Sequence, residues 1–210
     1  KGVHILCCYQ GSIVENCQIL NNSSDSYGLG IYQSFLNRCT IIKNNSFEML
    51  LEVNYDSRLT NCLISENISS SDILIRLWDG SLMSNCTVVK NEAKGNYGTF
   101  NEILGIALST VQNSIIVGNK CERVVMTFDG YYDQPSSWVF NNMIESNDID
   151  GNMDGSLKWA AFNDPVNGDY SLSEKSICIN AGLDVDDSLD LYGNPRKQGS
   201  GVDLGAIEST

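Results

Sequence analysis

The chain has 210 residues and carries 26 acidic against 13 basic side chains, which gives a net charge of −13. This charge argues against nucleic acids and anionic membranes as partners, because both select basic proteins. No apolar run approaches the roughly 18 residues of a membrane-spanning helix. We see no signal peptide, and we expect the sequence to begin after one or inside a longer protein. The single histidine, His4, disfavours a His-based triad or a His-rich zinc site.

One motif occurs six times between residues 1 and 147. Its position zero is small or polar: Cys17, Cys39, Cys62, Cys86, Ser114 and Asn142. Aliphatic residues stand at +2, namely Ile19, Ile41, Ile64, Val88, Ile116 and Ile144, and at −3, namely Val14, Leu36, Leu59, Met83, Val111 and Val139. Asn recurs at +5, in Asn22, Asn44, Asn67, Asn91, Asn119 and Asn147. Successive motifs are 22 to 28 residues apart, which is typical of a solenoid coil.

The offsets predict two strands joined by a corner. Positions zero and +2 lie on one face of a strand, so both point into the core. Position −3 is also apolar, so the chain must bend at −2 and −1. Asn at −1, replaced only by Arg38, suits a bend because it tolerates the left-handed conformation. We expect the +5 Asn to end the second strand in the same conformation and to stack in a hydrogen-bonded ladder.

The stretch between each +5 Asn and the next coil varies in length and carries a further apolar run, such as Ile73–Leu77. Each coil is therefore predicted to contain three strands. We therefore predict an all-β fold: a right-handed, single-stranded parallel β-helix of about six to seven coils over residues 1–147. An all-β sandwich is the alternative, but it gives no reason for the repeat. Insertions in a solenoid gather on one face, which is often the binding face.

Residues 148–210 are rich in Gly, Asp and Asn and predict a loop-dominated cap packed on the solenoid. A cap is needed because an open last coil exposes unpaired strand edges.

Two stretches of this segment resemble a known family. Asp164–Leu172 with Ser176–Gly182 resembles the "DP…GDYxL…SPAIDAG" run of bacterial β-helix surface proteins, although Cys178 stands where Pro is usual. Asp190–Arg196 with Gly201–Glu208 resembles the "D…G…PR…G…VDIGAYE" signature of the choice-of-anchor Q domain. The upstream repeats are similar to those of pectate-lyase-like and polymorphic outer-membrane proteins. The resemblance implies a secreted or surface-anchored bacterial protein, and it implies no particular reaction.

A half-motif for calcium lies in the same segment. Asp150, Asn152 and Asp154 alternate before Gly155, as in the first half of a calcium loop, but position twelve is Ala161 instead of Glu. Calcium is therefore one interpretation, and an Asx-rich turn is the other.

Two candidate catalytic pairs occupy matching positions in neighbouring coils. Asp56 and Asp79 each follow an aromatic residue, and Arg58 and Arg76 are close by. A polysaccharide lyase of this fold needs carboxylates from successive coils to hold a cation and a base to take the proton. Structural aromatics beside a turn explain the same residues without chemistry.

The exposed aromatics of the variable stretches are the predicted ligand-binding residues, since sugars stack on such rings. They are Tyr55, Trp78, Tyr97, Tyr131 and Tyr132, with Asp133 beside the last two. The alternative is that Tyr55 and Trp78 lie in the core.

The cysteines at position zero are expected to be buried and reduced, and to serve as small packing units. We expect Lys43, Glu66 and Lys90, at position +4, to form a salt-bridge ladder.

As a whole, the sequence predicts a non-catalytic extracellular module that binds a glycan or another surface partner. The alternative function is a polysaccharide lyase or glycoside hydrolase, for which inverting hydrolysis would need two carboxylates facing each other across a groove.

Overall fold

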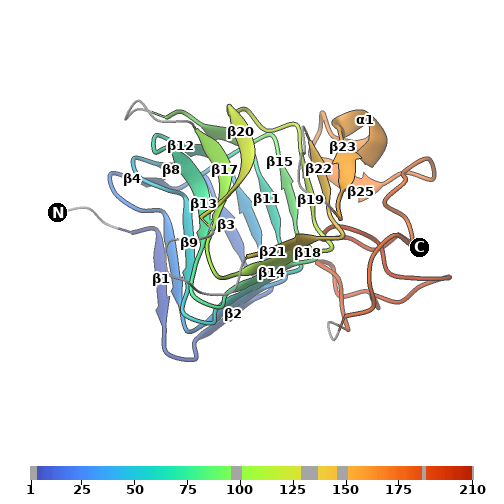
Figure 1. The fold of residues 1–210 in the computed structure, drawn as a ribbon, viewed down its shortest axis with the longest axis horizontal. Coiled ribbons are helices and arrows are strands. Elements are labelled where there is room, and N and C mark those ends of the chain that lie inside the picture. The colour runs from blue at the N-terminus through green and yellow to red at the C-terminus, as the bar shows by residue number, and fades with distance from the viewer. Residues whose placement is uncertain (1–3, 96–100, 129–136, 146–150, 186–187, 210) are drawn as a thin grey trace.

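Strands recur in a fixed order along the chain and pair with their counterparts one coil later. The computed structural model describes residues 4–95, 101–128, 137–145, 151–185 and 188–209. Four parallel sheets stack along one axis (Figure 1), and the short helix α1 (Leu157–Ala160) is the only α-helix in these ranges. The arrangement is compatible with the predicted parallel β-helix.

The sheets are named A to D here. Sheet A contains β1 (Leu6–Tyr9), β5 (Leu29–Tyr32), β9 (Leu51–Asn54), β13 (Ile73–Leu77), β17 (Glu102–Ile106) and β20 (Arg123–Thr127). Sheet B contains β2 (Ile13–Glu15), β6 (Phe35–Asn37), β10 (Arg58–Thr60), β14 (Leu82–Ser84), β18 (Thr110–Gln112) and β21 (Trp138–Phe140). Sheet C contains β3 (Gln18–Leu20), β7 (Thr40–Ile42), β11 (Leu63–Ser65), β15 (Thr87–Val89), β19 (Ile115–Val117), β22 (Met143–Glu145) and β23 (Met153–Gly155).

Sheet D is a short addition to the three strands predicted for each coil. It contains β4 (Ser23–Ser24), β8 (Asn45–Ser46), β12 (Ile68–Ser69) and β16 (Glu92–Ala93). A separate antiparallel pair, β24 (Phe162–Asp164) and β25 (Asp169–Leu172), follows α1.

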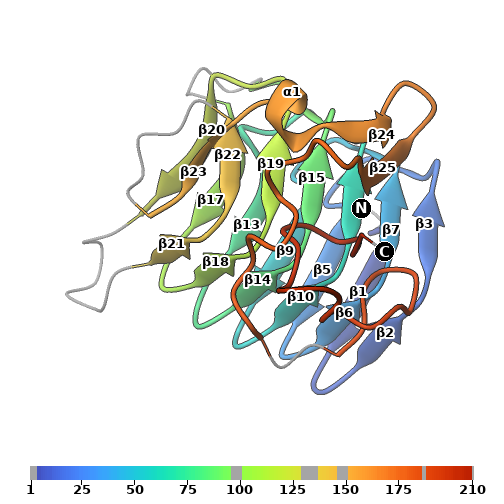
Figure 2. The same cartoon turned by 90° about the vertical axis from the view of Figure 1, so that its right-hand side faces the viewer.

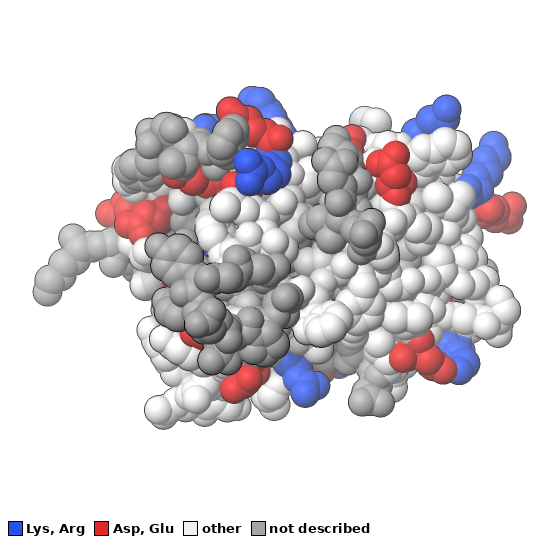
Figure 3. All heavy atoms as spheres, in the orientation of Figure 1, with Lys and Arg blue, Asp and Glu red and all other residues white. Residues whose placement is uncertain are grey.

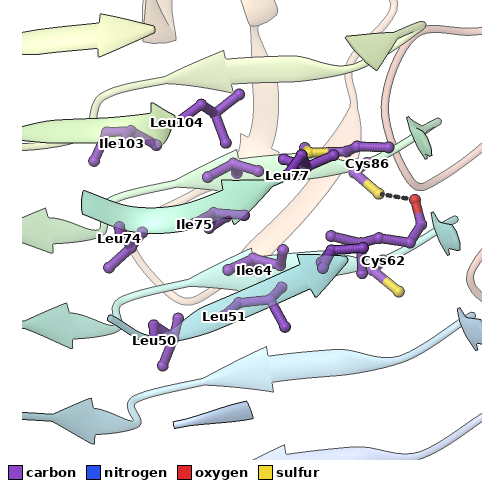
Figure 4. Packing of buried hydrophobic residues seen from close by; sticks show 14 of the residues in the cluster. Leu50, Leu51, Cys62, Ile64, Leu74, Ile75, Leu77, Cys86, Ile103 and Leu104 are labelled. Carbon is purple, nitrogen blue, oxygen red and sulfur yellow. Dashed lines mark hydrogen bonds between the residues drawn. The ribbon is translucent and has the colours of Figure 1, made fainter. Parts of the chain in front are cut away.

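The predicted register of the inward columns is confirmed. Ile19 pairs with Ile41, which pairs with Ile64, and the −3 residues pair in the same way from β2 to β21. The columns of sheets A, B and C meet in one core, and Figure 4 shows the part of it around Ile64, Ile75 and Leu104. Burial of aliphatic side chains in this core is the main stabilising contribution to the stack.

The corner between sheets B and C forms as predicted. All six residues at −1 have a left-handed backbone, with φ between 50° and 54°: Asn16, Arg38, Asn61, Asn85, Asn113 and Asn141. The second corner differs from the prediction. The left-handed residue is the one at +4, as in Lys43 (φ 57°) and Glu66 (φ 56°), and not the +5 Asn. The +5 Asn does not adopt the left-handed conformation, and its side chain forms the ladder.

The asparagine ladder itself is confirmed from Asn22 to Asn119. The Oδ1 atom of Asn67 accepts hydrogen bonds from the backbone N (2.9 Å) and Nδ2 (3.0 Å) of Asn44. Asn67 donates in turn to Asn91, and Asn91 to Asn119. Asn147 lies outside the described residues. Buried amides are thereby satisfied along the described part of this corner.

The cysteines follow the prediction with one exception. All eight are free thiols, and Cys39, Cys62 and Cys86 are fully buried, whereas Cys17 is exposed.

The predicted salt-bridge ladder forms only in its first step, since Lys43 lies 3.7 Å from Glu66 but Lys90 donates to the carbonyl of Pro165.

The C-terminal segment packs on the side of the stack. The described residues from 156 onward cover the outer face of sheet C (Figure 2), where they bury the outward side chains of Leu63, Val89 and Ile115. These outward positions are apolar and need a cover, whereas the edge of β22 is already met by β23. The result is a second hydrophobic core beside the first.

Candidate functional site

A groove runs over the outer face of sheet B, across successive coils. Its volume is about 770 Å³. The sheet contributes Ile13, Glu15, Phe35, Asn37, Arg58, Thr60, Leu82, Ser84, Gln112 and Phe140, and the C-terminal segment contributes one wall with Leu183, Asp184 and Val185. We take this groove as the candidate site because it is concave, lined by residues from six coils and open to solvent.

The repeat explains how the lining residues reach the groove. In each strand of sheet B the −3 residue points into the core, so its neighbours at −4 and −2 point outward. Arg58 pairs in register with Phe35 on one side and Leu82 on the other. Outward residues therefore form two straight columns, with one strand spacing of about 4.8 Å between members.

The two columns carry both rings and polar side chains. Phe35 is 37% exposed, and the guanidinium of Arg58 lies over its ring, 5.8 Å from the centroid. Thr60 donates to the Oδ1 of Asn37 at 3.0 Å, which holds that amide in place. The combination of apolar rings with fixed polar groups suits a ligand that has both apolar faces and hydroxyl groups.

The two carboxylates of the groove are each paired with a cation. Glu15 lies 3.2 Å from the guanidinium of Arg38 and also accepts a hydrogen bond from Asn37 at 2.8 Å. Asp184 pairs with Lys197. Both carboxylates of the groove are therefore engaged in ion pairs.

The predicted aromatic residues that the structure describes lie along sheet A, not in this groove. Tyr55 is 51% exposed and ends a row of rings, in which Tyr9 stacks on Tyr32 at 5.1 Å and Tyr32 lies 6.5 Å from Tyr55. Trp78 is half-buried, 6.2 Å from Phe128. Tyr97, Tyr131, Tyr132 and Asp133 lie outside the described residues.

An ion-pair cluster stands beside these rings. Arg76 pairs with Glu52, which also accepts the hydroxyl proton of Tyr32 at 2.7 Å, and the Arg76 guanidinium lies 5.1 Å from the centre of the Trp78 ring. Glu52 is only 7% exposed. Burial and the hydrogen bond to Glu52 raise the pKa of Tyr32. The cluster thus fixes the ring row on the surface of sheet A.

The four predicted catalytic residues do not gather at one place. Asp56 and Asp79 are neighbours at the corner between sheets A and B, where the backbone N of Asp56 donates to the carbonyl of Asp79 at 2.8 Å. Arg58 faces the groove of sheet B, whereas Arg76 is engaged with Glu52 on sheet A. The corner turns the chain between each Asp and the strand that follows, so neighbours in sequence face different sides.

Asn152 has a structural role in the predicted calcium half-motif. Its Oδ1 accepts from the backbone N (3.1 Å) and Nδ2 (2.9 Å) of Asn142, and its own Nδ2 donates to Val139. It therefore extends the column of position-zero residues. Asp154 is exposed on β23, and Asp150 lies outside the described residues. Calcium binding stays a prediction, and within the ranges described no cluster of three or more His, Cys, Asp or Glu side chains has metal-binding geometry.

The residues of the C-terminal signature form a buried polar network. Arg196, 2% exposed, donates to the Oδ1 of Asn61 at 2.7 Å and to the carbonyl of Gly205 at 2.7 Å, and lies 3.5 Å from Glu208. Asp190 accepts from the backbone N of Glu208 at 3.0 Å. The signature thus joins the C-terminal segment to the corner of the stack, which is a structural role.

No family model matches the chain. No curated protein matches it either. No α-helix in the described ranges has the length and apolarity to cross a membrane.

The groove was not predicted, although the sequence carries a signal for it. Because the −3 residue of each strand in sheet B points into the core, the residues at −4 and −2 must point outward. At these offsets stand the rings of Phe35, Trp138 and Phe140 together with the amides of Asn37 and Gln112. The predicted ligand-binding residues come from the variable stretches, and those that the structure describes lie along sheet A.

Proposed function

We propose that this chain is a non-catalytic glycan-binding module of a secreted or surface-anchored bacterial protein, and that the groove of sheet B is its binding site. In this proposal the stack is a right-handed β-helix of six to seven coils, related to pectate-lyase-like and polymorphic outer-membrane repeats, and the C-terminal segment is of the choice-of-anchor Q type.

The supporting observation is the double column of rings and polar groups in an open groove about 770 Å³ in volume. Strand spacing places successive side chains about 4.8 Å apart, which is close to the repeat of sugar units in an extended chain. Phe35 and Phe140 offer rings for the apolar faces of sugars, and Asn37 and Gln112 offer amides for hydroxyl groups.

The charge of the molecule favours neutral ligands. The chain carries a net charge of −13, and the acidic and basic side chains on the face drawn in Figure 3 lie in small mixed groups with uncharged surface between them. No broad basic area is visible on the described part of that face. An acidic glycan would therefore meet repulsion without a matching patch.

The test is calorimetric titration with a panel of neutral and acidic oligosaccharides. Phe35→Ala and Phe140→Ala should each weaken binding about fivefold, since a ring contact contributes about 1 kcal/mol. Lys43→Ala, at the corner that follows β7 of sheet C, should leave affinity unchanged, as should Tyr192→Ala at a second cavity of about 810 Å³ in the C-terminal segment.

Two results would contradict the proposal. If Tyr55→Ala weakens binding while both Phe variants bind normally, the site lies on sheet A. If incubation with the same glycans gives unsaturated or new reducing-end products, the chain is a polysaccharide lyase or a glycoside hydrolase, which is the alternative function.

A further inference from the structure

A second cavity lies within the C-terminal segment and shares no lining residue with the groove of sheet B. Its volume is about 810 Å³, and its wall is formed by the hairpin β24–β25 and the loops that follow it (Figure 2). Leu172, Ile179 and Ile207 line it with apolar side chains, and Tyr192, which is 64% exposed, adds a ring. The cavity therefore has room for a small ligand with an apolar part.

Three side-chain amides of this cavity use their donors within the protein. Asn163 and Gln198 each donate from the NH2 end to a backbone carbonyl at 3.3 Å, and Asn194 donates to the carboxylate of Asp190 at 3.3 Å. Carbonyls and carboxylates only accept hydrogen bonds, so these partners determine the orientation of each amide.

The opposite ends of the same amides are acceptors without a partner. Their carbonyl oxygens accept no hydrogen bond anywhere in the described part of the chain. Glu174 adds an exposed carboxylate to the lining and Glu208 a buried one, and none of the described lining residues is Lys or Arg. The cavity thus offers acceptors and negative charge in excess of donors.

The buried network next to the cavity does not cancel this charge. Arg196 lies 3.5 Å from Glu208, but Asp190 and Asp203 are buried in the same network, at 0% and 1% exposure. Even when Glu208 is protonated, two carboxylates face one guanidinium. A negative potential therefore remains at the cavity and attracts cations.

We propose that this cavity is a binding site for a primary ammonium group carried on a short alkyl chain. An ammonium nitrogen has three donors and no acceptor, which matches amide oxygens beside the carboxyl groups of Glu174 and Glu208. The alkyl chain packs on Leu172 and Ile207, and the ring of Tyr192 attracts the cation through its face. The site is separate from the glycan groove and does not depend on it.

An organic cation matches this lining better than a metal ion does. Nowhere in the described ranges are three His, Cys, Asp or Glu side chains grouped as metal ligands, and the apolar lining gives an ion nothing to bind. Two sources share the ammonium chemistry, namely a free amine and the side chain of a lysine in a polypeptide.

The test is a titration of the whole chain with butylammonium chloride, followed by the shifts of backbone amide signals in nuclear magnetic resonance. The shifts should saturate and concentrate in the residues that line the cavity. Butan-1-ol has the same alkyl chain without the charge and should bind at least about tenfold more weakly. Excess calcium should leave the affinity for butylammonium unchanged.

A second ligand distinguishes the two sources. If Nα-acetyl-lysine methylamide binds about tenfold more tightly than butylammonium, the peptide groups contribute and a lysyl side chain is the source. Equal affinities show that only the ammonium group is recognised, as expected for a free amine.

Single substitutions locate the site. Glu174→Gln and Tyr192→Ala should each weaken butylammonium binding about threefold, through loss of a carboxylate and of a ring face. Glu122→Gln is the matched control, because it removes an equal charge from an exposed residue outside the cavity and should leave affinity unchanged. Equal losses in Glu122→Gln and Glu174→Gln, equal binding of butan-1-ol, or displacement by calcium would overturn the proposal.

The pH dependence of binding gives an independent readout. Burial raises the pKa of Glu208 to about 7, and the charged groups that face it are Arg196, Asp203, Asp190 and, across the cavity, Glu174. An alkylammonium keeps its proton in this range and prefers the ionised carboxylate, so affinity should rise as the pH increases through about 7.

Glu208→Gln should abolish this rise, because the amide does not titrate. The profile of the native chain is informative by itself if that variant does not fold. An affinity that stays constant with pH in the native chain would overturn the assignment of the ammonium group to this cavity.

Discussion

At the scale of single residues, one asparagine per coil satisfies several buried groups at once. Asn67 is fully buried, and its side chain accepts from Asn44 and donates to Asn91 and to the carbonyl of Ile41 (2.7 Å). Few other side chains combine a donor and an acceptor at this length. The recurrence of Asn at +5 in the sequence is therefore explained by hydrogen bonding along the stack, rather than by backbone conformation.

Asn67→Ala should lower the free energy of unfolding by about 3 kcal/mol, because it leaves buried donors and acceptors unpaired. Urea denaturation followed by circular dichroism measures this change. Asn22→Ala is the control and should lower it by less than about 1 kcal/mol, since Asn22 is exposed and water can replace its partners. Equal losses at both sites would refute the ladder as a source of stability.

Glu208 should make stability depend on pH. Burial, reinforced by the charge of Asp203, raises the pKa of Glu208 from 4.5 to about 7, although Arg196 and the backbone N–H of Asp203 act in the other direction. The folded protein thus holds this proton more tightly than the unfolded chain. The resulting stabilisation is complete below about pH 4.5 and is lost as pH rises through about 7.

Glu208→Gln isolates this contribution, since Gln resembles the protonated acid and does not titrate. The stability of the variant relative to the native chain should rise between pH 4.5 and 7, as measured by thermal unfolding in a series of buffers. A difference that is constant over this range would show that Glu208 keeps an ordinary pKa.

At the scale of elements, the sequence predicts strands and corners well where the repeat is strict. The −1 corner is recognisable because Asn tolerates a left-handed backbone. The second corner was placed one residue too late, because Lys43 and Glu66 are not typical left-handed residues and only the fold imposes that conformation on them. Sheet D escaped prediction because its strands are two residues long.

Arg196 should be essential for the attachment of the C-terminal segment to the stack. Arg196→Ala removes its bonds to Asn61 and Gly205 and leaves Glu208 buried without its cation, which should cost about 3–5 kcal/mol. Limited proteolysis should then cut within residues 183–209. Lys197→Ala removes only an exposed ion pair and should change stability by less than about 1 kcal/mol. Equal protease resistance in the two variants would contradict this role.

The calcium prediction belongs to the segment around β23. If Asp154 binds calcium, chelation should lower the melting temperature of the native chain, and Asp154→Ala should abolish that effect. Glu174→Ala, an exposed acid that follows β25, should retain it. A flat calorimetric titration with calcium would remove the hypothesis.

At the scale of the whole molecule, the repeat predicts the stack but not what covers it. Several outward +1 and +3 residues of sheet C are apolar, among them Leu63, Val89 and Val117, and these three are buried. They are a usable signal that sheet C carries a layer. Which segment forms the layer depends on long-range packing, and spacing within the chain does not encode it.

The layer over sheet C has a consequence for the way the protein is made. Residues 156–209 are synthesised after every strand of sheets A and B, so the apolar outer face of sheet C is exposed to water until this segment has formed. Exposed apolar surface of this kind invites aggregation of the nascent protein. Yield in the cell should therefore depend on how quickly residues 156–209 pack on sheet C, more than on the intrinsic stability of the coils.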